Sequence, residues 1–309
     1  MFRLIGETNI NFIGARKMAF FVSLALVGLG VFALVMITTG QGNLGIDFAG
    51  GNMIYGYFEQ PVPIQDVRNS LTADFPDAEI TELSDFEEAN AFIIKVKQPE
   101  TEQEGRDRAI QLRQAIAGAF AENPFTVESE HVIGPSVGET LRKDAMYAVL
   151  LSLFGIIVYI SLRFDFRSGV AATIATFHDV LAVLGITFII GIEFDLLLIT
   201  ALLTLAGYSL TDTVVVYDRI RENLKKYRSK GEFVAAINNS INEVLSRTVN
   251  TSLTTLLVVG TLFFLGGEVL RTFALALIMG VLVGTYSSVF VASPIVVEWE
   301  ARFPQRFKT

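Results

Sequence analysis

Four residues within apolar stretches of the sequence could do chemistry, and Asp212 is the most informative of them. It lies in Gly207 to Asn223, which reads GYSLTDTVVVYDRIREN, inside a run apolar enough to cross a bilayer. Placing an aspartate in a membrane span costs about 2.5 to 3.5 kcal/mol on insertion scales. We therefore interpret Asp212 as a candidate functional residue that faces the protein interior.

Arg247 is the candidate counter-charge for Asp212, because it stands at the start of the next apolar stretch, directly before Thr248. An aspartate that alternately pairs with an arginine and loses it would bind and release a proton. A static buried ion pair that orders the helices is the alternative, and the residues leave both open. Three nearby hydroxyl groups can hydrogen-bond to Asp212 or to the helix backbone: those of Ser209, Thr211 and Thr213.

His178 and Asp179 are the other two candidates, near the middle of the preceding apolar stretch. A tight turn after Ile192 makes the two stretches neighbours, so this pair could approach the level of Asp212. One interpretation is a proton relay, and the other is a histidine that only satisfies a neighbouring helix. A metal site is disfavoured because no further histidine or acidic cluster completes a ligand shell.

Enzymatic chemistry finds little support in the sequence. There are no cysteines, which excludes thiolate metal sites and cysteine nucleophiles. We find no Walker motif, no convincing hydrolase set and no basic patch for nucleic acid. We therefore expect no enzymatic activity and no cofactor, with protons as the coupling ion and energy drawn from the membrane potential.

The elements that must position these residues are membrane spans. With 51% hydrophobic residues and a mean hydropathy of +0.50, the chain is too apolar for an ordinary soluble domain. A span needs about 20 apolar residues. Six segments qualify: Met18 to Thr38, Ala145 to Leu162, Gly169 to Ile192, Leu196 to Tyr217, Thr248 to Gly267 and Thr272 to Val297. Six spans put both termini on one side.

The distribution of Lys and Arg predicts the orientation of these spans, because basic residues favour cytoplasmic loops. Basic residues precede the first span, separate the second from the third, follow the sixth, and fill the predicted cytoplasmic loop 218–247. Both termini are therefore expected in the cytoplasm. The apolar residues in this loop, partly at helical spacing, are compatible with an amphipathic helix or with a solvated connector.

Residues 41–142 form the predicted outer domain, between residues 1–40 with the first span and residues 143–309 with the other five. The segment is acidic and accounts for the net charge of −8 of the whole chain. Its apolar pattern predicts the order strand, helix, strand, strand, helix, strand, which is that of an α+β ferredoxin-like domain. Nothing in this domain suggests catalysis.

Two glycine patterns are expected to be structural. Gly280 and Gly284 have the GxxxG spacing that lets helices approach closely, and the serines after them, Ser287 among them, fit the same packing role. The run GIDFAGG, Gly45 to Gly51, suits a tight turn between the first span and the outer domain.

Six stretches carry a resemblance that covers nearly the whole chain. They are GIDFAGG from Gly45, VGETLRKDA from Val137, the pair His178 and Asp179, GYSLTDTVVVYDRIREN from Gly207, SRTVNTSLTTL from Ser246, and GTYSSVFVASP from Gly284. With these stretches the chain resembles SecF members of the SecD/SecF family, bacterial membrane proteins that assist protein export.

The resemblance implies a polytopic α-helical protein of the bacterial cytoplasmic (inner) membrane. It would form half of a resistance-nodulation-division type transporter, completed by SecD. A proton-driven cycle would move the outer domains and help an unfolded preprotein leave the SecYEG channel, with membrane lipid around the spans. The family associates proton coupling with the positions of Asp212 and Arg247. Two alternatives stay open: a proton-coupled transporter of small molecules or lipids, and a non-transporting scaffold of the translocon.

Overall fold

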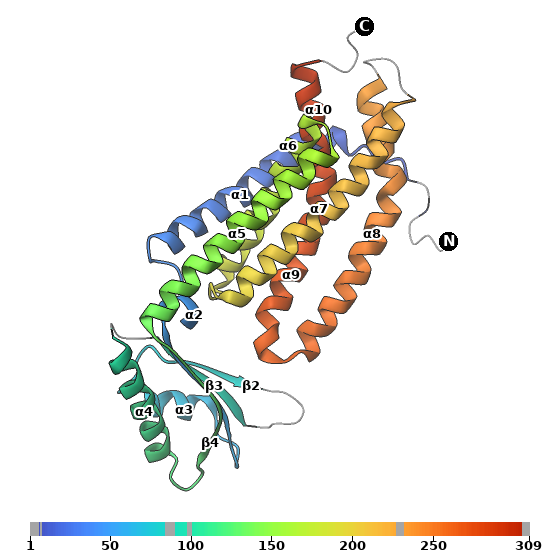
Figure 1. Cartoon of the computed structure of the whole chain (residues 1–309). Coiled ribbons are helices and arrows are strands. Elements are labelled where there is room, and N and C mark those ends of the chain that lie inside the picture. The colour runs from blue at the N-terminus through green and yellow to red at the C-terminus, as the bar shows by residue number, and fades with distance from the viewer. Residues whose placement is uncertain (1–5, 7, 84–89, 98–100, 227–231, 305–309) are drawn as a thin grey trace. The chain divides into compact units, whose positions relative to one another are not determined.

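The computed structural model describes residues 6, 8–83, 90–97, 101–226 and 232–304 of the chain (Figure 1). The chain divides into two compact units. One comprises Met1–Gly42, Val149–Ile192 and Leu197–Thr309, and it is helical. The other comprises Asn43–Ala148 with Glu193–Leu196, and it contains the sheet.

Six helical spans in the described residues are long and apolar enough to cross a membrane, which confirms the predicted number. The first five are α1 (Arg16–Thr38), α5 (Pro135–Arg163), α6 (Phe166–Ile190), α7 (Leu196–Leu224) and α8 (Phe233–Leu265). The sixth consists of α9 (Gly267–Ser287), a π-helical turn (Ser288–Ala292) and α10 (Ser293–Arg302). A short 3-10 helix, Ile13–Ala15, precedes α1.

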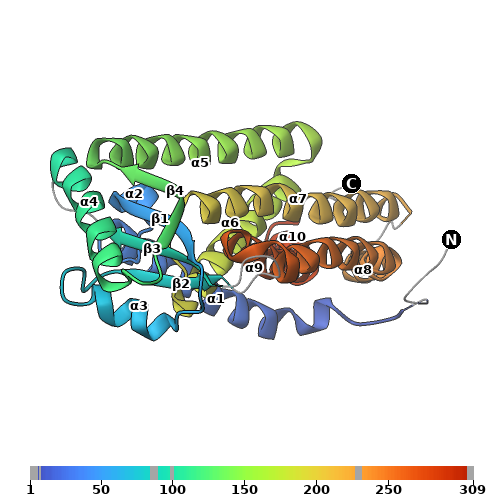
Figure 2. The ribbon, with the colours of Figure 1, turned by 90° about the horizontal axis from the view of Figure 1, so that it is seen from below.

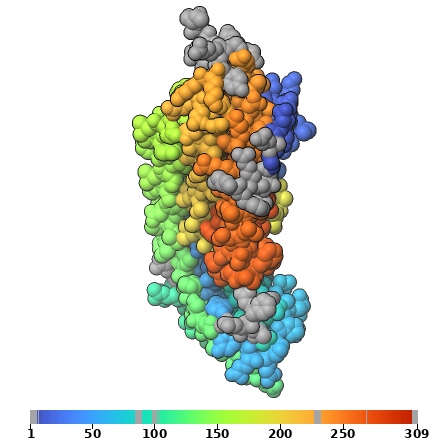
Figure 3. Space-filling model, turned by 90° about the vertical axis from the view of Figure 1, so that its right-hand side faces the viewer, coloured from blue at the N-terminus to red at the C-terminus, as the bar shows by residue number. Residues whose placement is uncertain are grey.

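Burial separates inner spans from outer ones. About half of the apolar window is buried in α6, α7 and the sixth span, against 17% or less in α1, α5 and α8. Figure 2 shows α6 between α1 and α5, and Figure 3 shows the outer surface of α8 and α9 in orange. Apolar side chains of α8 such as Leu257, Val258 and Phe264 are exposed, as expected for a helix that faces lipid or another protein.

Helices extend through most of the predicted cytoplasmic loop 218–247, contrary to a simple connector. Helix α7 continues to Leu224, and α8 already begins at Phe233. The helical spacing in this segment buries Phe233, Ile237 and Ile241 in the core of the helical unit. Hydropathy shows where an apolar run ends, but a helix does not have to end there.

Close backbone approaches lock neighbouring spans together. A Cβ added to Gly280 would lie 2.6 Å from the Leu205 side chain of α7, and one added to Gly284 would lie 3.1 Å from Ser209. The GxxxG pair of α9 therefore packs against α7. An even closer approach joins α1 to α6, where a Cβ on Gly30 would lie 2.1 Å from the carbonyl oxygen of Leu181.

The sheet unit has the predicted ferredoxin-like order of elements. These are β1 (Gly51–Phe58), α3 (Ile64–Leu71), β2 (Glu79–Leu83), β3 (Ala91–Lys97), α4 (Glu102–Ala119) and β4 (Phe125–Ile133). The antiparallel sheet runs β2-β3-β1-β4, so each helix connects two strands that have a third strand between them. Alternating side chains of β1 and β3, such as Ile54 and Ile94, are buried against the helices with Leu71 and Leu112.

The GIDFAGG run forms one helical turn, α2 (Ile46–Ala49), where a simple tight turn was expected. It ends at Gly50, whose φ of 76° favours glycine. This segment forms hydrogen bonds with the turn between α6 and α7. The amide of Gly45 donates to the carbonyl of Phe194 at 3.0 Å, and the Asp47 carboxylate accepts from the amide of Leu196 at 3.0 Å.

Candidate functional site

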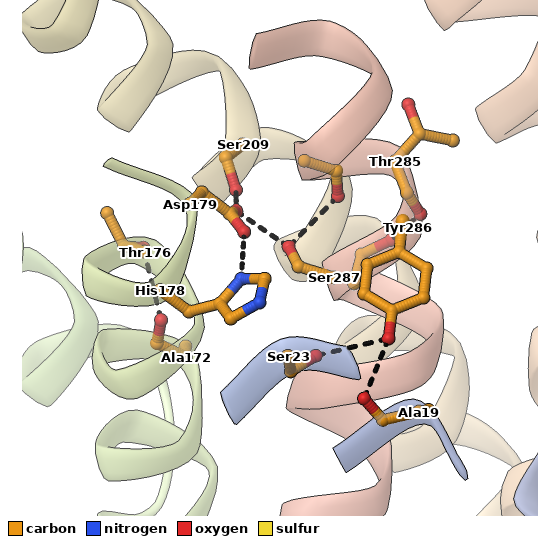
Figure 4. A network of polar contacts seen from close by, with 12 residues as sticks. Ala19, Ser23, Ala172, Thr176, His178, Asp179, Ser209, Thr285, Tyr286 and Ser287 are labelled. Atoms are coloured by element: carbon orange, nitrogen blue, oxygen red, sulfur yellow. Dashed lines mark hydrogen bonds and ion pairs between the residues drawn. The ribbon is translucent and has the colours of Figure 1, made fainter. Parts of the chain in front are cut away.

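Asp179 of α6 is the centre of a polar cluster inside the helical unit (Figure 4). Its side chain is completely buried. One carboxylate oxygen contacts Nδ1 of His178 at 2.8 Å, while the other accepts hydrogen bonds from Ser209 of α7 and, at 2.6 Å, from Ser287 of α9. Three inner spans therefore meet at this carboxyl group.

His178 extends the cluster toward α1. Its ring centroid lies 6.3 Å from that of Tyr286, the residue before Ser287 on α9. The Tyr286 hydroxyl donates to the carbonyl of Ala19 at 2.9 Å and lies 3.1 Å from the Ser23 hydroxyl. Within the described residues, the second ring nitrogen of His178, Nε2, has no hydrogen-bond partner although it is buried. The imidazole therefore has one nitrogen committed to Asp179 and one available.

Asp212 lies one helical turn beyond Ser209 on α7, about 4.5 Å along the axis at 1.5 Å per residue. It is 3% exposed, and the Ser252 hydroxyl of α8 interacts with its carboxylate. The hydroxyls of Ser252 and Thr285 lie 2.6 Å apart, which connects α8 to α9. In the part of the chain that the structure describes, Oδ2 of Asp212 has no hydrogen-bond partner.

Arg247 does not pair directly with Asp212 in this structure. The side-chain nitrogens of Arg247 are all more than 4.0 Å from the Asp212 carboxylate. The positive charge of Arg247 still acts on this carboxylate from that distance. Arg247 lines a cavity of about 590 Å³ between α5, α7 and α8, together with charged residues such as Asp218 and Glu243. The structure thus brings His178 and Asp179 together, and it keeps the Asp212 carboxylate and the Arg247 guanidinium apart.

Two serines of this site were assigned other roles from the sequence. Ser209 was expected to serve Asp212 or the helix backbone, but it donates to Asp179. Ser287 was assigned to packing, and it also donates to Asp179. The sequence did contain a signal for the role of Ser287, namely the several serines that follow Gly284. A serine side chain is small enough for close helix packing and also carries a hydrogen-bond donor. Thr211 bonds to the backbone carbonyl of Gly207 at 3.1 Å, one of the two expected options.

The cluster has the chemistry of proton transfer. Carboxyl, imidazole and hydroxyl groups can each hold or pass a proton within hydrogen-bond distance. Among the described residues, no group of three or more histidine, cysteine or acidic side chains could hold a metal ion. The two intramembrane carboxyl groups stand on adjacent inner spans, with Ser209 one turn from Asp212 and in contact with Asp179.

Comparison with known proteins places these features in a family. The family model described as "Protein export membrane protein SecD/SecF, C-terminal" matches residues 114–302. The protein translocase subunit SecF of Thermodesulfovibrio yellowstonii is 50% identical over 299 residues, which cover 96% of each chain. The SecF protein of Vibrio alginolyticus is 39% identical over 299 residues, 96% of this chain and 91% of that protein.

A solved structure of a related protein is also similar to this chain. The crystal structure of SecDF from Thermus thermophilus, a translocon-associated membrane protein, matches with a TM-score of 0.79 and 40% identity. The match covers 96% of this chain and 39% of that longer one. Family model, sequence relatives and fold agree, and the chain belongs to the SecD/SecF family of protein export membrane proteins.

Proposed function

We propose that this chain is the SecF-type subunit of a Sec protein-export machine and that it works with a SecD-type partner. The support is the near full-length similarity to proteins named protein translocase subunit SecF. In the fused SecDF relative, the matched part is 39% of the chain, so a second part of greater length is available to act as that partner. SecYEG and the unfolded preprotein complete the proposed assembly.

The proposed location is the bacterial cytoplasmic membrane, with both termini in the cytoplasm and residues 41–142 outside. The basic residues at the chain ends and between the second and third spans support this orientation. In the fold, a segment of the α6–α7 turn is part of the same compact unit as the sheet.

The proton-motive force is the proposed energy source, and Asp212 is the proposed proton-binding residue. One observation carries this proposal: within the described residues, one carboxylate oxygen of the buried Asp212 has no partner, and the expected counter-charge, Arg247, is more than 4.0 Å away. A carboxylate buried without a cation is costly, whereas its protonated form is not. A cycle in which Arg247 approaches and withdraws would bind and release one proton. His178 and Asp179 would relay it.

The experiment is export complementation in a bacterial strain depleted of its own SecF. We expect Asp212→Asn to leave precursor protein unprocessed in a pulse-chase assay, at normal abundance of the variant in the membrane. Glu222→Gln is the matched control, because this exposed carboxylate lies on the same helix and pairs with Arg219 on the surface. Normal export with Asp212→Asn would refute proton coupling at this residue.

A purely structural role makes a different prediction, and a second readout separates the two. In inverted vesicles containing the complex, dissipating the proton-motive force should slow export with the unchanged chain. It should have less effect with Asp212→Asn, because the coupled step is already lost. A variant that loses export but stays fully sensitive to the uncoupler would support the scaffold alternative. Proton flux that depends on a small molecule would support the transporter alternative.

A further inference from the structure

A second cavity of the helical unit, of about 860 Å³, combines positive charge with exposed apolar surface. It lies where α5 ends, α6 begins and α7 ends, and Val296 of α10 contributes to its wall. Figure 1 shows the end of α5 and α10 at the same end of the helical unit. Four cationic side chains line this cavity: Arg163, Arg167, Arg221 and Lys225.

Two of the four cations are already committed to partners. Arg167 pairs with Glu300 and donates to the carbonyl of Phe303 at 2.6 Å. Arg163 pairs with Asp218. The one carboxylate in the lining, Asp165, accepts from the Ser168 hydroxyl at 2.9 Å and caps the start of α6.

Among the described residues, Arg221 and Lys225 are the two cations of the lining without an acidic partner. Both are exposed, and neither forms a salt bridge with any described residue. Arg221 lies in the last turn of α7, and Lys225 directly follows Leu224, the last residue of that helix. Both line the cavity, which therefore offers two positive charges. This arrangement suits a single group with several anionic oxygens, such as a phosphate.

The lining of the cavity also includes exposed apolar side chains. The side chains of Leu162 and Phe166 are 85% and 77% exposed, although they lie at the ends of two membrane spans. Phe166 packs edge-on against Trp299 at 6.0 Å between ring centroids. Tryptophan side chains such as that of Trp299 concentrate at the headgroup level of a bilayer. Basic pockets between spans at that level suit anionic lipid headgroups.

We propose that this cavity binds the headgroup of an anionic phospholipid. Its phosphate lies between Arg221 and Lys225, and its acyl chains run over Leu162 and Phe166. The apolar part of the lining distinguishes a phospholipid from free phosphate, which would gain nothing from the exposed leucine and phenylalanine. The site is separate from Asp212, Asp179 and Ser287, and it does not depend on the proposed function.

Trp299 supplies the readout, because it is the only tryptophan in the chain and it contacts a residue of the cavity wall. The purified full chain in a neutral detergent is titrated with dihexanoyl phosphatidylglycerol while the tryptophan emission is recorded. Dihexanoyl phosphatidylcholine and glycerol 3-phosphate are the two comparison ligands. We expect a saturable change with phosphatidylglycerol, and a much weaker response to either comparison ligand.

Charge variants test the assignment. Arg221→Gln with Lys225→Gln should weaken phosphatidylglycerol binding by at least about tenfold, since each basic residue near an anionic surface contributes to the attraction. Lys17→Gln with Lys226→Gln is the control, because it removes two exposed charges outside the cavity lining and should leave binding unchanged. Arg221→Lys with Lys225→Arg should retain it.

Three outcomes would overturn the proposal. They are no saturable response to phosphatidylglycerol, equal binding by the neutral double variant, and equally tight binding of glycerol 3-phosphate. The last outcome would identify a site for a soluble phosphate compound. Arg221→Lys with Lys225→Arg controls for misfolding. If this variant binds and the neutral double variant does not, the loss of binding is caused by the loss of charge.

Discussion

The contact between α1 and α6 gives a sharp prediction for Gly30→Ala. At this crossing, the added Cβ atom would lie 2.1 Å from the carbonyl oxygen of Leu181 and 2.5 Å from its carbonyl carbon. Both atoms are backbone, so no side-chain rotation can relieve the contact. Gly185 on α6 makes the approach reciprocal, because a Cβ there would lie 2.6 Å from the amide nitrogen of Gly30.

The size of the effect follows from the geometry. Close carbon-to-oxygen contacts between packed backbones are about 3.3 to 3.6 Å, so α1 would have to withdraw by roughly 1.2 Å from Leu181. Association of spans in a membrane depends on close packing, since lipid supplies no hydrophobic drive between them. Overpacking of this kind costs about 1 to 3 kcal/mol. We expect Gly30→Ala to lower the free energy of unfolding by an amount in the upper part of that range.

Gly28→Ala is the matched control for this measurement. Gly28 lies on the same helix, and a Cβ added to it would meet nothing within 4 Å. Each variant is unfolded from mild detergent micelles by sodium dodecyl sulfate, and helix content is followed by circular dichroism. Gly28→Ala should be neutral or slightly stabilising, because alanine favours the helix by up to about 1 kcal/mol. Equal unfolding curves for the two variants would refute the backbone contact as a determinant of stability.

Two further predictions concern polar contacts. Ser287→Ala should impair export without changing membrane abundance, because it removes one of the donors to Asp179; export at the normal rate in a pulse-chase would remove Ser287 from the site. In the turn between α6 and α7, burial opposes ionisation of Glu193, but hydrogen bonds with Glu79 and Lys95 and nearby lysine charges outweigh it, so the pKa of Glu193 is lowered. This stabilisation is present above the ordinary glutamate pKa of about 4.3 and is lost as pH falls through the lower folded value. The protection of the amide hydrogens in residues 43–47, measured relative to their intrinsic exchange rate at each pH, should then fall on acidification. Glu193→Gln should flatten this dependence, and identical pH profiles of protection would contradict it.

Much of the fold could be predicted because two strong physical constraints act on the sequence. The bilayer requires long apolar helices, which located all six spans. Alternation of buried residues and turn residues located the four strands of the sheet. The extent of the helices was harder to predict: α8 has 33 residues, about 50 Å at 1.5 Å per residue, well beyond a hydrocarbon core of about 30 Å.

The candidate site could be predicted only in part. An acidic residue in an apolar run is visible by itself, so Asp212 and Asp179 could be found. Their partners depend on the rotation of each helix and on which spans are neighbours. Ser209 therefore could not be assigned to Asp179 rather than to Asp212, and Ser287 could not be distinguished from a packing residue. The separation of Asp212 from Arg247 depends on conformation, which the sequence does not encode as a pattern.

The π-helical turn Ser288–Ala292 changes which side chains of the sixth span face α6, the antiparallel span beside it. The sixth span contacts α6 at two points, through Ser287 with Asp179 and through Glu300 with Arg167. These points are 300 − 287 = 13 residues apart on the sixth span but 179 − 167 = 12 residues apart on α6. A regular helix would turn the second contact away by about 100°, the rotation of one residue. A π-helical turn absorbs one residue, so both contacts can form.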